Sequence, residues 1–144
     1  MNDSTFQQTV AEICARDPRF AADSYFFLRE ALDFTVKALK KPVDGPDRHV
    51  TGVELSDGLR QYALLEFGPL ALTVLRAWGI QRTEDIGEIV FNLVESGRLG
   101  KTDKDNRGDF ANGYDFFEAF AKPYEVAPEA KRPRRTRRTK PPAR

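Results

Sequence analysis

Residues 100–110, GKTDKDNRGDF, hold fragments of three site motifs with different chemistry. GKT resembles the end of a phosphate-binding P-loop, DKDNRGD the beginning of a calcium-binding loop, and RGD an adhesion tripeptide. A P-loop also needs a glycine five residues before the glycine of GKT, in a loop that follows a strand. Glu95 stands at that position, at the end of a predicted helix. We therefore reject the P-loop, and RGD has no adhesive role in a chain that we expect to be cytoplasmic.

The acidic residues of this segment fit a calcium loop only in part. Asp103 and Asp105 match its first and third positions. Arg107, however, is a cation at the fifth position, and Tyr114 replaces the bidentate glutamate at the twelfth. We expect no metal ion or cofactor here. Weak cation binding by Asp103, Asp105 and Asp109 stays open beside the favoured alternative, a solvated turn, because Asp, Asn and Gly suit turn geometry.

Few other groups could do catalytic chemistry. His49 is the sole histidine and Cys14 the sole cysteine, so a histidine relay, an internal disulfide and a cysteine-rich zinc site all lack a second member. Cys14 lies on an apolar helical face, where an inert thiol is favoured over a nucleophile. Four acids of the helix predicted near residue 83 look like a solvated face: Glu84, Asp85, Glu88 and Glu95. We therefore expect a protein that is not an enzyme.

The net charge of +1 hides two segments of opposite charge. Residues 131–144, KRPRRTRRTKPPAR, contain eight Lys or Arg and no acid, whereas the first 130 residues hold 15 basic and 22 acidic side chains, a net charge of −7. We expect a helical globular domain over residues 1–125 and a disordered basic tail over residues 126–144. No apolar run approaches the ~20 residues of a membrane span, and the start lacks a signal-peptide pattern. We therefore expect a cytoplasmic protein without a membrane partner.

Apolar spacing predicts five helices, over about residues 4–16, 24–40, 51–67, 69–78 and 83–95. Ser4 with Gln7, and Thr51 with Glu54, resemble capping boxes at the start of the first and third helices. Gly79 is a natural left-handed stop for the fourth. The predicted buried faces are, in order, Phe6, Val10, Ile13 and Cys14; Leu28, Leu32, Val36 and Leu39; Leu55, Leu59 and Tyr62; Leu70, Val74 and Trp78; and Ile86, Ile89, Val90 and Leu93.

After Gly97 the pattern changes. RLGKT is a strand candidate, DKDNRGD a polar turn, and FANGYDFFEAF an aromatic return that ends as a helical turn. We therefore predict a mainly α fold with a small C-terminal β-hairpin over residues 98–116. Three helices followed by a hairpin is the element order of a winged helix, preceded here by two further helices.

The fifth predicted helix would be the recognition helix of such a fold, and its composition argues against that role. Its presumed outer face carries no Lys or Arg, the side chains that most often read guanine. Phosphates would repel the residues that it does carry there, which are Glu84, Asp85, Glu88, Asn92 and Glu95. We do not expect this helix to read DNA directly.

The block HVTGVELSDGLRQYALLEFGPLALTVLRAWGIQRTEDIGEIVFNLVESGRLGKT, followed by DF and GYDFFEAF, is similar to a small uncharacterised bacterial protein family. The signatures are HVTG-x-EL, FGPLA, WGI, TED-x-GEIVFNLV and LGKT, and the resemblance covers about residues 25–120. It implies no activity and no catalytic residues, and the basic tail lies outside it.

The tail carries the functional expectation. Eight cations can neutralise several phosphates and release counterions, which favours RNA or ribosome binding over recognition of a DNA operator. The predicted phosphate-binding residues are Lys131, Arg132, Arg134, Arg135, Arg137, Arg138, Lys140 and Arg144. The alternatives are a merely solubilising tail and an acidic protein–protein interaction module that recognises a basic partner. In that module, anchors could come from Phe110, Tyr114, Phe116, Phe117 and Phe120, most of which we expect in the core.

Overall fold

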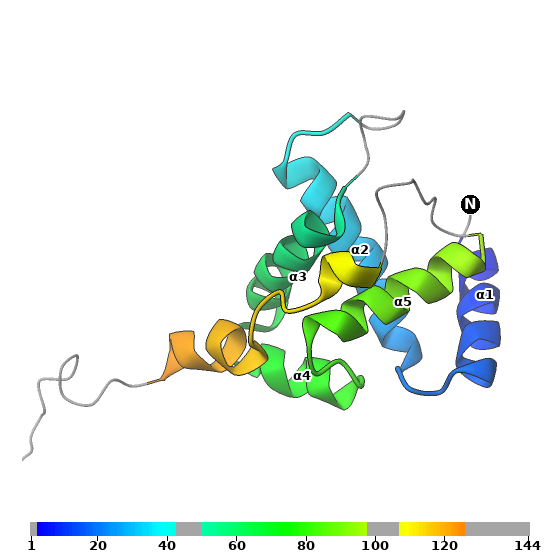
Figure 1. The fold of residues 1–144 in the computed structure, drawn as a ribbon. Coiled ribbons are helices and arrows are strands. Elements are labelled where there is room, and N and C mark those ends of the chain that lie inside the picture. Colours follow the sequence, from blue (N-terminus) through cyan, green and yellow to red (C-terminus); the bar gives the residue numbers. More distant parts are fainter. Residues whose placement is uncertain (1–2, 43–49, 98–106, 126–144) are drawn as a thin grey trace, which may run out of the picture.

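The computed structural model describes residues 3–42, 50–97 and 107–125, and within these ranges the protein is mainly α with no strand. Five α-helices (Figure 1) are joined to short 3-10 or π turns, to which we give the label η. The elements are α1 (Asp3–Arg16), α2 (Ala22–Ala38), α3 (Gly52–Phe67), η2 (Gly68–Leu70), α4 (Ala71–Ala77), α5 (Thr83–Glu95), η3 (Arg107–Phe110), η4 (Phe117–Ala121) and η5 (Lys122–Tyr124).

Helices α1 and α2 bury the apolar faces that their spacing predicts, with small differences at the ends. Phe6, Val10 and Ile13 of α1 are buried, and Cys14 is half-buried. Helix α2 begins and ends about two residues before the predicted bounds. Leu39 therefore lies beyond the helix and is exposed, contrary to its predicted place on the buried face.

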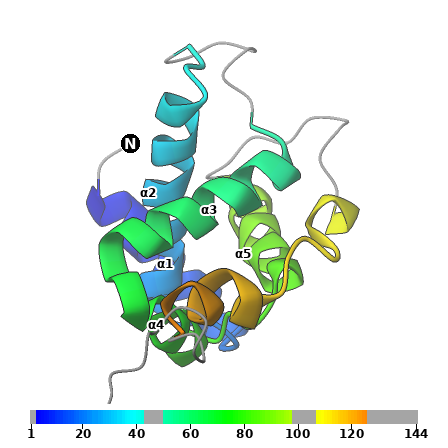
Figure 2. The ribbon, with the colours of Figure 1, turned by 90° about the vertical axis from the view of Figure 1, so that its left-hand side faces the viewer.

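Helix α3 has the predicted bounds because its caps are encoded locally. The Thr51 hydroxyl accepts a hydrogen bond from the Glu54 amide while the Glu54 carboxylate accepts one from the Thr51 amide, which completes the capping box. Helix α3 packs across α2 (Figure 2). At their closest approach a Cβ on Gly58 would lie 2.8 Å from Thr35 Cβ and would overlap its hydroxyl, so glycine permits this spacing.

The buried face of α4 differs from the prediction. Leu70 is 63% exposed, Val74 and Trp78 are half-buried, and the buried residues are Ala71 and Leu75. The reason is that residues 68–70 form the 3-10 turn η2, so the α-helix starts three residues after Gly68 with its face rotated by one position. Gly79, with φ of +96°, ends the helix as predicted.

Helix α5 lies across the middle of the molecule, with α1 at one end and η3 beside it (Figure 1). Ile86, Ile89 and Leu93 are buried, as predicted. Asn92 was expected on the outer face but is only 7% exposed, because its amide has partners elsewhere in the fold.

The predicted hairpin is wrong in the part that the structure describes. Residues 107–110 form a 3-10 turn and residues 111–115 form a turn and irregular chain, so the return arm is not a strand. The predicted helical ending of this segment is confirmed by the π turn and the 3-10 turn over residues 117–124. Tertiary contacts hold it in this form: the Gly113 amide donates to the Thr83 hydroxyl at 3.0 Å, and the Tyr114 hydroxyl donates to the Ser56 carbonyl at 2.8 Å. The first arm, over residues 98–102, lies outside the described residues.

Candidate functional site

The predicted phosphate-binding residues of the tail all lie outside the residues that the structure describes, as do His49, Asp103 and Asp105. The described structure therefore shows what the helical body could contribute to nucleic-acid binding. Three features of the body bear on nucleic-acid binding: the exposure of α5, the state of the cations, and the surfaces that could take a partner.

One flank of α5 is covered by the link between α1 and α2. The Asn92 side-chain amide donates to Asp17 Oδ2 and contacts the buried Tyr25 hydroxyl, both at 3.0 Å. Arg19 bridges Asp17 at 2.7 Å and Glu88 at 3.3 Å. Hydrogen bonding from Arg19 holds the pKa of Asp17 far below its usual range. These contacts tie the carboxylates of this flank to neighbouring groups and leave α5 without a free polar face here.

The other flank and the N-terminus of α5 are covered by η3 and the turn that follows it. A Cβ on Gly87 would lie 2.8 Å from the Phe110 ring, so the ring rests directly on the helix backbone. At the N-terminus, the Asn112 amide donates to Glu84. With these contacts on both flanks and at the N-terminus, α5 has fewer side chains free to reach base edges in a major groove.

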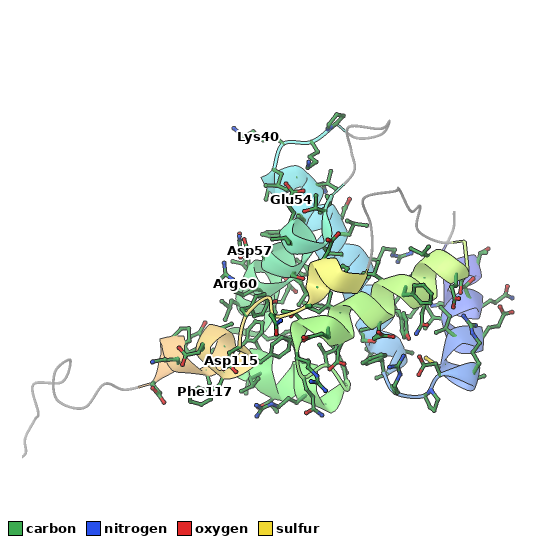
Figure 3. The ribbon with its side chains drawn as sticks, in the orientation of Figure 1. Lys40, Glu54, Asp57, Arg60, Asp115 and Phe117 are labelled. Carbon is green, nitrogen blue, oxygen red and sulfur yellow. The ribbon has the colours of Figure 1, made fainter. Side chains whose placement is uncertain are left out.

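Many cations of the body are already paired with carboxylates. Arg60 contacts Asp57 at 2.9 Å, and both project from α3 on the flank away from α1 (Figure 3). Further ion pairs join Arg19 to Asp17 and Glu88, Lys37 to Asp33, Lys41 to Glu54, and Lys122 to Glu118. Because each pair cancels charge locally, these five cations offer little positive charge to phosphate.

A shallow cleft lies between the α1–α2 link and the turn that joins α4 to α5. Its lining includes two cations, Arg19 and Arg82. Arg19 is committed to its carboxylate partners, and Asp85 already accepts the Gln81 amide at 2.8 Å. Arg82 has no ion pair among the described residues, so the cleft offers an anion one uncommitted guanidinium, with the Asp85 carboxylate beside it.

The groups with catalytic potential do not converge in the described part of the chain. Burial, and then the nearby Asp17 carboxylate, raise the pKa of the Cys14 thiol, so the unreactive protonated form is favoured. Among the described residues, no group of three His, Cys, Asp or Glu side chains could hold a metal ion.

The C-terminal aromatic residues are mostly core. Phe110, Phe116 and Phe120 are at most 6% exposed, and the half-buried Tyr114 stacks on Phe116 with ring centroids 5.7 Å apart. Phe117 is 45% exposed and is the member of this set best placed to meet a partner (Figure 3).

A second aromatic cluster was not predicted from the sequence. Phe27, only 4% exposed, lies at its centre, and four half-buried rings extend it toward the surface: Phe34, Tyr62, Phe67 and Trp78. We call these five residues the aromatic ladder. Neighbouring ring centroids are 5.2–5.8 Å apart, the spacing of favourable aromatic pairs. The residues come from α2, α3 and the end of α4, so no local spacing reveals the cluster.

No protein-family model, curated protein or solved structure matches the chain. The resemblance to an uncharacterised bacterial family therefore stays a prediction. No helix in the described ranges has both the length and the apolar character needed to cross a lipid bilayer.

Proposed function

We propose that this chain is a non-catalytic, nucleic-acid-associated accessory protein that binds phosphates through its basic tail. RNA or the ribosome is favoured over a specific DNA site. The observation that carries the proposal is the charge division: eight cations and no acid over residues 131–144, against a net charge of −7 over the residues before them. Flexible polycations bind RNA through counterion release, without sequence-specific contacts.

The body supports this division because its own surface disfavours phosphate. Helix α5, the one candidate for groove recognition, is covered on two flanks, and five of the described cations are held in ion pairs. A body of net negative charge repels a polyanion at long range. Affinity for nucleic acid therefore belongs to the tail.

The test is a titration of mixed-sequence RNA with the full chain at several salt concentrations. If the tail makes five to eight phosphate contacts, the slope of log affinity against log salt is roughly −4 to −7. Replacing all eight tail cations by Gln, or ending the chain after Glu129, should abolish binding at moderate salt while the helical body stays folded. Arg→Lys substitutions should weaken binding less, since charge remains and only bidentate geometry is lost.

The matched control removes cations from the body. Arg76→Gln with Arg82→Gln neutralises two exposed side chains of α4 and the α4–α5 turn, and we expect little change in affinity. If the chain without tail cations binds RNA as tightly as the native chain, the proposal is wrong. If neither form binds, the second candidate takes its place.

The second candidate is an acidic helical module that recognises a basic protein partner. The aromatic ladder favours it, because its half-buried rings lie beside the carboxylates of Glu30 and Glu66, a setting that suits cationic side chains. In that case a chain with a Gln-substituted tail should capture an arginine-rich peptide, and substitution of the carboxylates beside the ladder should abolish capture.

A further inference from the structure

The aromatic ladder leaves part of its ring surface exposed to solvent. Four of its five members are half-buried, and only Phe27 is buried. Partly exposed aromatic rings are typical anchors for a partner, because they offer large rigid contact surfaces at low entropic cost.

Carboxylates without a cationic partner border the ladder. The exposed Glu30 accepts the Tyr62 hydroxyl at 3.0 Å, and the exposed Glu66 lies close enough to raise the pKa of that phenol further. Burial is the largest cause, and together these effects raise the pKa of Tyr62 to about 12. Among the charged side chains of the ladder's own helices, Lys37 and Arg60 are paired with Asp33 and Asp57. The uncommitted charge at the ladder is therefore mainly negative, with Arg76 of α4 as a cation.

Rings bordered by carboxylates select a cationic, planar group. Arginine fits best, because its guanidinium stacks on aromatic faces and pairs with carboxylates through two donors. The body already uses this contact, since the Arg29 guanidinium lies 4.2 Å from the centre of the Phe6 ring. Proline-rich segments also dock on aromatic surfaces.

An arginine- and proline-rich segment belongs to the chain itself, and the described chain before it ends close to the ladder. The described chain ends at residue 125, next to Tyr124, whose hydroxyl lies 4.0 Å from a Cβ built on Gly68. Gly68 directly follows Phe67 of the ladder. Six residues in extended form, from 126 to 131, span about 19 Å. The ladder runs from Phe67 through Phe27 and Tyr62 to Phe34 in centroid steps of 5.4, 5.2 and 5.3 Å, so the tail reaches all of it.

We infer that the aromatic ladder is the docking site of the chain's own basic tail, residues 131–144. Arginines of the tail stack on the half-buried rings, and Glu30 and Glu66 hold their guanidinium groups. The net charge of +8 on the tail and −7 on the body draws the two together. The ladder then competes with any polyanion for the cations of the tail.

The test places a spin label on the tail of the full-length chain. Cys14→Ser and Thr139→Cys give a single labelling position, and nuclear magnetic resonance then records which signals the label broadens. At low salt we expect loss of the Trp78 indole signal and of amide signals from α2 and α3. At about 1 M salt, where the Debye length is about 3 Å, these signals should return.

The controls separate the ladder from general charge attraction. Glu30→Gln with Glu66→Gln should restore the Trp78 signal at low salt. Glu12→Gln with Glu95→Gln removes the same charge from exposed positions of α1 and α5 and should leave the broadening unchanged. A mixture of isotope-labelled chains with spin-labelled unlabelled chains should show no broadening.

A second measurement needs no substitution in the body. Trp78 is the sole tryptophan, so its fluorescence reports on the ladder in the native chain. Salt should shift its emission to longer wavelength and increase quenching by acrylamide, and both responses should vanish when the tail cations are replaced by Gln.

Three results overturn the inference: no broadening near Trp78 at low salt, equal broadening over α1 and α5, or the same broadening near Trp78 in the mixed sample, which would assign the docked tail to a second copy. Docking can change the affinity for RNA, but whether the tail binds RNA at all is measured separately. The tail can dock and fail to bind RNA, or bind RNA and fail to dock, so the two proposals fail separately.

Discussion

Gly58→Ala should destabilise the protein although alanine is the better helix former. Gly58 lies where α3 comes closest to α2, and an added Cβ would overlap the Thr35 hydroxyl and lie 2.8 Å from its Cβ. Thr35 cannot move aside easily, because it is 2% exposed and its hydroxyl donates to the Ala31 carbonyl at 2.7 Å. The two helices must therefore separate or Thr35 must change rotamer.

The change in the free energy of unfolding of Gly58→Ala is the sum of two opposing effects. Replacing glycine by alanine inside a helix gains up to about 1 kcal/mol. Overpacking a well-packed core costs about 1–3 kcal/mol, and a contact this close with a buried side chain belongs at the upper end. The net loss should be about 1–2 kcal/mol, which lowers the melting temperature of a domain of this size by roughly 5–10 °C.

The assay is urea unfolding of Gly58→Ala alone and combined with Thr35→Ala. The second substitution removes the overlapping hydroxyl but leaves the Cβ, so it should recover part of the loss, with a coupling energy of about 0.5–1 kcal/mol. Gly97→Ala is the control: nothing lies within 4 Å, and its cost comes from a φ of +78° that Thr35→Ala cannot relieve. A Gly58→Ala variant as stable as the native chain, or a purely additive pair, would refute the reasoning.

Three further results are expected. Asn92→Ala should cost about 1–3 kcal/mol in urea unfolding, because it leaves the buried Tyr25 hydroxyl without its side-chain partner. The pKa of Asp17 is lower in the folded state than in the unfolded state, so its carboxylate stabilises the fold above the unfolded pKa of about 3.9. This stabilisation is lost as the pH falls below that value. Asp17→Asn should therefore make the free energy of unfolding depend less on pH between about pH 4 and 2. Trp78→Ala should cost about 2–3 kcal/mol, less than a fully buried tryptophan, whereas the exposed Leu70→Ala should stay within about 0.5 kcal/mol.

The sequence predicted those helix ends that local chemistry determines. Thr51 with Glu54 and the left-handed Gly79 fix the start of α3 and the end of α4 through contacts within a few residues. The buried face of α4 was wrong because its phase depends on the 3-10 turn before it. A stripe four residues apart, from Leu70 through Val74 to Trp78, predicts burial only if the helix is continuous.

The predictions for the candidate sites were wrong for a different reason, because the positions of these residues depend on partners far away in the sequence. Asn92 has the spacing of an outer face, but it is buried because its side-chain amide forms hydrogen bonds with Tyr25 and Asp17. The alternating polar and aromatic residues before Phe117 suit a strand, yet Gly113 bonds to Thr83 of α5 and the segment turns instead. The aromatic ladder also joins residues from three helices, so periodicity along one helix cannot show it.

The close approach at Gly58 also explains why the ladder exists. Phe34 precedes Thr35, and Tyr62 lies one helical turn after Gly58, so a small residue at the crossing brings these two rings to 5.3 Å. A larger side chain there would separate α2 from α3 and open the ring contacts with them. Gly58→Ala should therefore weaken tail docking as well as the fold. The same substitution leaves the charge of the tail unchanged, so RNA affinity should hold or increase as docking is lost.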